Sequence, residues 1–301
     1  MFSTPLGLAS SIAAAGCAFS LVMFFEAVFA GEAEQIVAYV EHADADIWVM
    51  QRGVSNMHMS TSYLYDWKAT QIADVPGVAS AEPILYLNSV VETGGKQWFS
   101  YVVGLDVPGA TAGPWAMVAG KVEPGIGEAV VPDVLARMSD VGLGDKIRIT
   151  DQNFEIVGLS DGTFSIANPV FFITKTDLED IMTSLDITSF VLVKAEPGVN
   201  LTDLVDRIES NVEKVHALPA KQFVINDRQM ALQMGAETIA LMTVIGGALA
   251  VLLVAFTIYS QITRQRRELA IAKALGVTNK TLYLTVAVQA CVITLASVVF
   301  A

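Results

Sequence analysis

The chain has 301 residues, of which 53% are hydrophobic and 16% are charged, and its formal net charge is -13. The mean hydropathy is high, at +0.52, but the net charge is strongly negative. The charge excludes a protein that is apolar throughout. Its two cysteines, Cys17 and Cys291, both lie in apolar segments, which excludes a disulfide framework for the acidic remainder.

The charge is segregated along the chain. Residues 31–237 contain 13 Lys and Arg against 29 Asp and Glu, about -16 in formal charge, whereas residues 261–280 carry +4. A difference in charge between segments of one chain indicates that they lie on different sides of a membrane. Short basic loops stay in the cytoplasm, so we expect the acidic block on the other side of a membrane.

The first predicted element is a transmembrane helix over residues 1–30. Residues 1–25 contain no charge, and about 20 residues cross a hydrocarbon core roughly 30 Å thick. A cleaved signal peptide is the alternative. It is disfavoured because there is no basic n-region and the apolar run exceeds the usual 7–15 residues.

Residues 31–235 are predicted to form a large extracytoplasmic α+β domain inserted between the first two spans. The residues Ala33–His42 indicate a helix that continues the first span, and alternation over residues 45–50 indicates a strand. Thr93-Gly94-Gly95-Lys96 predicts a hairpin between strands over 84–92 and 97–105. A helix over 62–73 and a strand over 222–225 are further expectations, in a domain of two lobes around central strands.

Two more spans are expected, over residues 236–262 and 280–301. No charged residue occurs from Thr238 to Ser260 or from Thr281 to Ala301. The segment 263–279 between them must leave the hydrocarbon, where a central Arg or Lys costs about 2.5–3.5 kcal/mol. The chain ends in apolar sequence at Ala301, which predicts a fragment whose fourth span is absent.

The basic segment 263–279 is predicted to be an amphipathic cytoplasmic helix. Leu269, Ala272 and Leu275 fall on one face with cations around them, which suits a groove on a soluble partner. A helix held by anionic lipid at ~1 kcal/mol per cation explains the charge equally well. We expect Gly276 to end this helix and Thr278 to cap the next. The candidate partner-contacting residues are Arg264, Arg266, Arg267, Glu268, Leu269, Ala272, Lys273, Leu275 and Gly276.

Residues 267–276 read Arg267-Glu268-Leu269-Ala270-Ile271-Ala272-Lys273-Ala274-Leu275-Gly276. This stretch resembles a signature of the FtsX/MacB-type permeases of ATP-binding-cassette (ABC) systems. The signature reads Arg-Glu-Ile-Gly…Lys-Ala-Leu-Gly. Ala270 stands where many members have glycine. Residues 127–131 with 143–147, and residues 154–158, resemble strands of that family's outer domain. The likeness covers nearly the whole chain.

The resemblance implies a multi-pass permease subunit of a bacterial plasma (inner) membrane. A separate ATPase would bind ATP and Mg and press on the basic segment as a coupling helix. This agrees with the lack of a G-x-x-x-x-G-K-[ST] motif. We therefore expect no enzyme activity, cofactor or metal in this chain. Expected partners are the ATPase, a second copy, membrane lipid and a periplasmic adaptor or enzyme, but no nucleic acid.

Three functions stay open at this stage. The first is export or extraction of a substrate, and the second is a non-transporting scaffold that regulates a periplasmic enzyme. The third is a membrane-anchored hydrolase using Ser160, since residues 158–162 match G-x-S-x-G, although no helix is expected after them.

Two further patterns have competing explanations. Met57-His58-Met59 offers soft metal or haem ligands, but a loop or apolar patch is the more common role of such a segment. Gly246, Gly247 and Ala250 form a strip of small residues that permits close helix packing, either in a dimer or against the first span.

Overall fold

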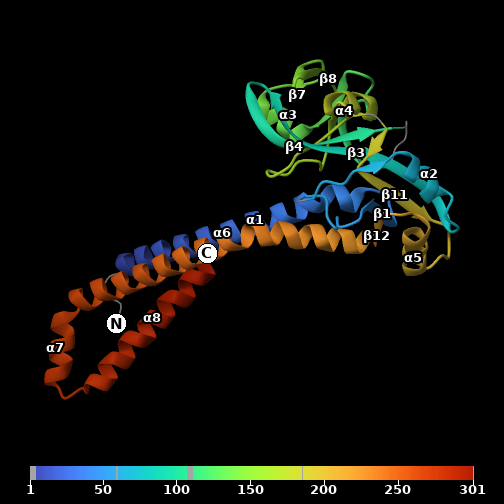
Figure 1. Cartoon of the computed structure of the whole chain (residues 1–301). Coiled ribbons are helices and arrows are strands. Elements are labelled where there is room, and N and C mark those ends of the chain that lie inside the picture. Colours follow the sequence, from blue (N-terminus) through green and yellow to red (C-terminus); the bar gives the residue numbers. More distant parts are fainter. Residues whose placement is uncertain (1–4, 59, 107–110, 185, 301) are drawn as a thin grey trace. The chain divides into compact units, whose positions relative to one another are not determined.

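The computed structural model describes residues 5–58, 60–106, 111–184 and 186–300. The chain divides into two compact units (Figure 1). The α+β unit comprises residues 31–233, and the helical unit comprises residues 1–30 and 234–301.

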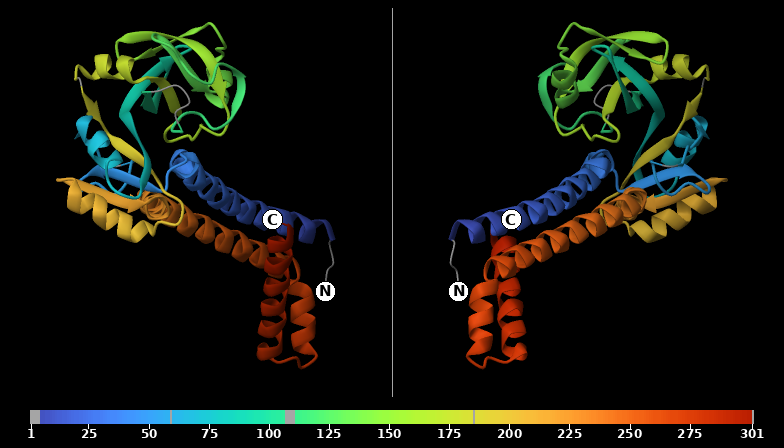
Figure 2. Two further views of the ribbon diagram at one scale, coloured as in Figure 1. Left: turned by 90° about the vertical axis from the view of Figure 1, so that its right-hand side faces the viewer. Right: turned by 90° about the vertical axis from the view of Figure 1, so that its left-hand side faces the viewer.

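Two long helices run through both units. They are α1 (Pro5–His42) and α6 (Ala220–Arg264), and the helical unit also contains α7 (Arg266–Ala274) and α8 (Asn279–Phe300). The helix expected over Ala33–His42 is confirmed as the last part of α1. The chain reverses direction around α7, between the end of α6 and the start of α8 (Figure 2).

The α+β unit contains the strands and the shorter helices. In chain order these are β1 (Ile47–Gln51), β2 (Leu64–Tyr65), α2 (Trp67–Ala73), β3 (Val78–Thr93), β4 (Lys96–Leu105), β5 (Met117–Gly120), β6 (Glu128–Pro132), α3 (Asp133–Ser139), β7 (Lys146–Ile149), β8 (Gln152–Ser160), β9 (Val170–Thr174), α4 (Lys175–Met182), β10 (Ile187–Thr188), β11 (Phe190–Ala195), α5 (Leu201–Asn211) and β12 (Val215–Pro219). The predicted α+β class is confirmed.

The long strand β3 joins two lobes. Its first half, Val78–Ile84, pairs with β11, and its second half, Leu85–Thr93, pairs with β4. The hairpin predicted at Gly94 and Gly95 closes β3 onto β4 and is confirmed. The two-lobed organisation expected from the sequence therefore rests on one shared strand.

The first lobe is a sheet in the order β12-β1-β11-β3. Along β1, Ile47 and Val49 belong to the apolar cluster with α2 and α5, whereas Trp48 and Met50 belong to a second cluster on the opposite face. This is the period-two alternation of a strand that is buried on both faces.

The second lobe is a closed barrel. Its strands pair in the ring β3-β4-β9-β6-β8-β7 and back to β3, with β5 added at the edge of β8. Closure leaves no free edge within the ring. Its interior is filled by apolar side chains such as Leu85, Val102, Phe154 and Phe171, all fully buried.

The second cluster on β1, which we call the central cluster, joins both long helices to both lobes. It contains Tyr39 of α1, Phe223 of α6, Trp48, Phe172 and Phe190. The Trp48 and Phe223 rings stack at 4.8 Å between centroids, and Phe190 meets Trp48 edge to face at 5.6 Å. The end of α1 and the start of α6 are therefore anchored in the core of the α+β unit.

One predicted element starts too early, and another is wrong. The helix expected over 62–73 begins only at Trp67, because Leu64 and Tyr65 pair with β10. The strand expected over 222–225 is helical and belongs to α6. The strand of this region is β12, which pairs with β1 just before Ala220 and leaves Phe223 to reach the core from a helix.

Candidate functional site

The basic segment folds as a separate short helix, α7, between α6 and α8. Gly276 has φ +93°, and its N–H donates to Lys273 O at 3.1 Å, while Val277 N–H donates to Ala272 O at 3.2 Å. These two bonds form a Schellman motif. Thr278 Oγ1 accepts from Thr281 N at 3.4 Å at the start of α8. The predicted helix end and cap are both confirmed.

Within the described residues 266–274 of α7, none is buried by the rest of the chain. The cations Arg266, Arg267 and Lys273 are exposed, as is Glu268. The side chain of Arg264, the last residue of α6, lies outside the part that the structure describes.

The apolar face of α7 differs from the expected one. Leu275 is 81% exposed and Ile271 is 53% exposed, whereas Leu269 and Ala272 are half-buried. Ile271 and Leu275 lie one turn apart, so they form the exposed apolar pair. Ile271 is not among the residues predicted from the sequence, although its i,i+4 spacing from Leu275 signals the pair.

The small-residue strip lies on α6. A Cβ built at Gly246 would lie 2.3 Å from Cγ2 of Val22 on α1, whereas one at Gly247 would meet nothing within 4 Å. Ala250 is 2% exposed. Of the two predicted packing roles, the structure places Gly246 against α1, and Gly247 faces open space.

One helix among the described residues is long and apolar enough to cross a membrane. It is Leu241–Ser260, with a mean hydropathy of 2.5, and 6% of its apolar window is buried in the chain. Large side chains along it, including Val251, Leu252 and Phe256, are mostly exposed. So long an apolar surface is compatible with lipid rather than water.

Comparison with known families covers nearly all of the chain. Residues 6–211 match the MacB-like periplasmic core domain, and residues 240–301 match the C-terminal part of FtsX-like permeases. The chain belongs to the FtsX/MacB-type family of ABC transporter permeases.

Curated relatives of this permease are themselves described as ABC transporter permeases. The uncharacterized ABC transporter permease Rv2563 of Mycobacterium tuberculosis is 20% identical over 293 residues, which are 97% of this chain and 79% of the relative. A second permease of that organism, Rv0072, is 21% identical over 298 residues with the same coverage.

Two solved structures resemble part of the chain more distantly. The periplasmic region of MacB from Actinobacillus actinomycetemcomitans aligns with 61% of this chain and 92% of its own, at 11% identity and a TM-score of 0.45. The extracellular domain of the ABC-type transporter YknZ from Gram-positive bacteria aligns with 58% of this chain and 100% of its own, at 9% identity and the same TM-score.

The hydrolase motif of this permease is part of its packing. Ser160 ends β8 and is 1% exposed. Its Oγ donates to Val131 O at 3.2 Å and lies 2.6 Å from Oγ1 of Thr163. Neither partner is an acid or an imidazole, so the described surroundings of Ser160 do not form a nucleophile activated by a base.

The methionine and histidine segment is described only in part. Met59 lies outside the described residues, Met57 is buried, and no group of three His, Cys, Asp or Glu side chains in the described part could hold an ion. His58 instead forms polar contacts with Asn168 and Asp227.

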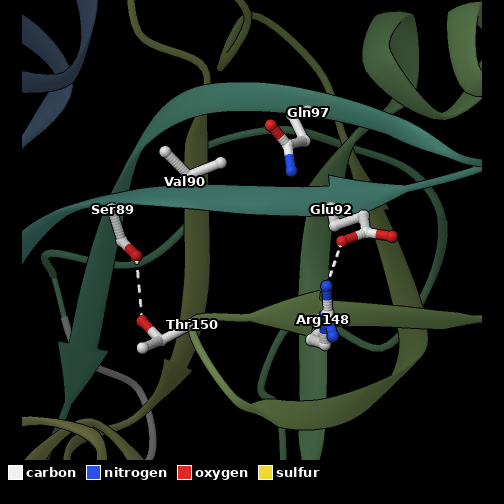
Figure 3. Close-up of a pocket in the computed structure, with 6 residues that line it drawn as sticks. All are labelled: Ser89, Val90, Glu92, Gln97, Arg148 and Thr150. Carbon is white, nitrogen blue, oxygen red and sulfur yellow. Dashed lines mark hydrogen bonds and ion pairs between the residues drawn. The ribbon is translucent and has the colours of Figure 1, made fainter.

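A shallow hollow of about 250 Å³ lies on the outside of the barrel (Figure 3). Four of its polar side chains pair with one another: Arg148 with Glu92, and Ser89 with Thr150 at 3.1 Å. Because these groups are already bonded, the hollow presents little unsatisfied chemistry to a ligand.

Proposed function

We propose that this permease transmits ATPase-driven motion from the cytoplasm to its α+β unit, which lies outside a bacterial plasma membrane. Three spans, over residues 1–30, 236–262 and 280–301, would carry it. The observation that supports this proposal is α7, an exposed helix that pairs the apolar Ile271 and Leu275 with Arg266, Arg267 and Lys273. Apolar side chains ringed by cations are what a protein groove recognises.

The central cluster supplies the route by which motion would enter the α+β unit. Tyr39 on α1 and Phe223 on α6 are both fully packed against the strands of the two lobes. Densely packed contacts transmit displacement rather than absorbing it. A push on α7 would pass along α6 and reach the strands through Phe223, with ATP and Mg bound by a partner ATPase.

Affinity purification of the tagged, full-length permease tests this proposal. The informative variant exchanges the charges of Arg267 and Glu268 (Arg267→Glu with Glu268→Arg). The matched control makes the same exchange at Arg148 and Glu92, an exposed ion pair of the barrel. An ABC ATPase should co-purify with the wild type and the control, and its recovery should fall at least about tenfold in the α7 variant because like charges then face each other.

Two results would contradict the proposal. Undiminished ATPase in the α7 variant would show that α7 is not the contact. No ATPase with any of the three proteins would leave α7 as a helix bound to anionic lipid.

The same purification separates the two transport-related functions. A periplasmic adaptor among the co-purifying proteins supports substrate export or extraction. A periplasmic hydrolase that depends on the permease for activity supports the scaffold. The homodimer is tested by the mass of the purified complex.

A further inference from the structure

The second turn of α6 holds the segment that follows β1. Asn226 Nδ2 donates to Ser55 O at 3.0 Å, and Met57 N donates to Asp227 Oδ1 at 2.7 Å. The Asp227 side chain is fully buried. Its Oδ1 accepts the bond from Met57, and together with the Asn226 bond this fixes the segment to α6.

His58 extends this connection to the barrel. Its Nδ1 lies 3.3 Å from Asp227 Oδ1, and its Nε2 lies 2.9 Å from Nδ2 of Asn168. Asn168 Oδ1 accepts from Ser165 Oγ at 2.6 Å, so its Nδ2 is the donor toward His58. With Asn168 Nδ2 as the donor, Nε2 of His58 is the acceptor, while Nδ1 faces Asp227 Oδ1 without a hydrogen bond between them.

Uncharged aromatic rings pack against His58. The Tyr101 ring packs edge-on against the imidazole at 5.1 Å, and Tyr86 packs on Tyr101 at 5.0 Å. Burial raises the pKa of both phenols, so they are uncharged at physiological pH. Arg228, next to Asp227, pairs with Glu41 of α1 at 2.7 Å.

The loop that receives the His58 contact is also held by α1. Ala167 N donates to Glu32 Oε1 at 2.8 Å, one residue before Asn168. The loop, residues 163–169, leads directly into β9, which lies between β4 and β6 in the barrel wall. A contact from α1 and a contact from His58, which lies beside Asp227 of α6, thus meet on two consecutive residues just before a central barrel strand.

We propose that the loop 163–169 is the point where displacement of α6 relative to α1 is passed to the barrel, with His58 as the positioning residue that links Asp227 to Asn168. This inference rests on the proposed function and names the residues through which that motion would act. Removing the imidazole should separate the barrel loop from α6, while the Met57–Asp227 bond keeps the segment 55–57 attached.

The test is hydrogen exchange of the full-length permease with its co-purified ATPase in lipid nanodiscs, with and without a non-hydrolysable ATP analogue. His58→Leu removes both polar contacts at similar volume, and His58→Gln retains a donor and an acceptor. His216→Leu is the matched control, because His216 lies 2.8 Å from Glu209 in a pair outside the loop.

We expect the analogue to change exchange at both 55–58 and 163–170 in the wild type and in the His216 control. In His58→Leu the change at 163–170 should fall at least about threefold, as expected for the loss of one buried hydrogen bond, while the change at 55–58 persists. His58→Gln should restore part of the response. If His58→Leu does not fold, Glu32→Ala tests the α1 side of the same loop.

The failures are distinguishable. An unchanged response at 163–170 in His58→Leu overturns the relay and leaves the proposed function intact. Equal loss at 55–58 and 163–170 shows a general structural role and also overturns it. No nucleotide response anywhere in 31–233 of the wild type overturns the proposed function, and the relay with it.

Discussion

Replacing Gly246 by alanine should force α1 and α6 apart. The added Cβ would lie 2.3 Å from Val22 Cγ2, where ordinary contacts are 3.4–4 Å, so one group must move by about 1 Å. Val22 cannot easily rotate away, because a β-branched side chain has one strongly preferred rotamer in a helix. Overpacking of this kind costs about 1–3 kcal/mol.

Gly247 provides the matched control. Both substitutions gain about 1 kcal/mol of helix propensity, but a Cβ at Gly247 meets nothing within 4 Å. The propensity gain therefore cancels when the two variants are compared. Gly246→Ala should be less stable than Gly247→Ala by the overpacking energy alone, about 1–3 kcal/mol.

The assay is reversible unfolding of the full-length permease in detergent, with Val22→Ala as the third variant. Val22→Ala removes the two methyl groups of the valine and should restore the lost stability in the Gly246→Ala background. The effects of Gly246→Ala and Val22→Ala on the free energy of unfolding should therefore not add. Equal stability of the two alanine variants, or additive effects of Gly246→Ala and Val22→Ala, would refute close packing of α1 and α6 at this position.

Two more predictions concern the α+β unit and are measured by denaturant titration of the full-length chain. Gly95→Ala should lower the free energy of unfolding by about 1–2 kcal/mol, because φ is +71° at this position. Gly94→Ala should lower it further, because the added Cβ would also lie 1.9 Å from Ser139 O. Equal losses for the two variants would contradict the hairpin geometry. Tyr39→Phe should cost about 1–2 kcal/mol by leaving Ala112 O without its donor. Burial raises the pKa of Tyr39, so the stability lost in Tyr39→Phe should be constant below pH ~10 and should shrink at higher pH. A loss that changes with pH in the acid range would contradict this prediction.

Local signals in the sequence predicted the elements that depend on neighbouring residues. The hairpin at Gly94 and Gly95 and the helix end at Gly276 were predicted because positive φ angles favour glycine. The cap at Thr278 was predicted from its position before an apolar helix. The likeness of 267–276 to a family signature indicated the permease family, which the family comparison confirms.

Other features depend on partners far away in the sequence. Residues 222–225 resemble a strand by composition, and only the packing of Phe223 on Trp48 explains why they begin a helix. The closed barrel also required β7 to pair with the distant strand β3, a pairing that no local pattern encodes. Tertiary context overrides local propensity in such segments because burial of large side chains contributes more free energy than propensity.

The sequence alone determined the order of apolar and acidic segments, the basic helix between two apolar helices, and the family, because these follow from composition and short motifs. Only the tertiary structure decided which glycine of the strip meets α1, and that Ile271 rather than Leu269 accompanies Leu275 on the surface. It alone brought His58 to Asn168, 110 residues further along the chain, and to Asp227 on α6. Contacts between distant segments form only when the whole fold has placed their backbones, so no local pattern in the sequence encodes them.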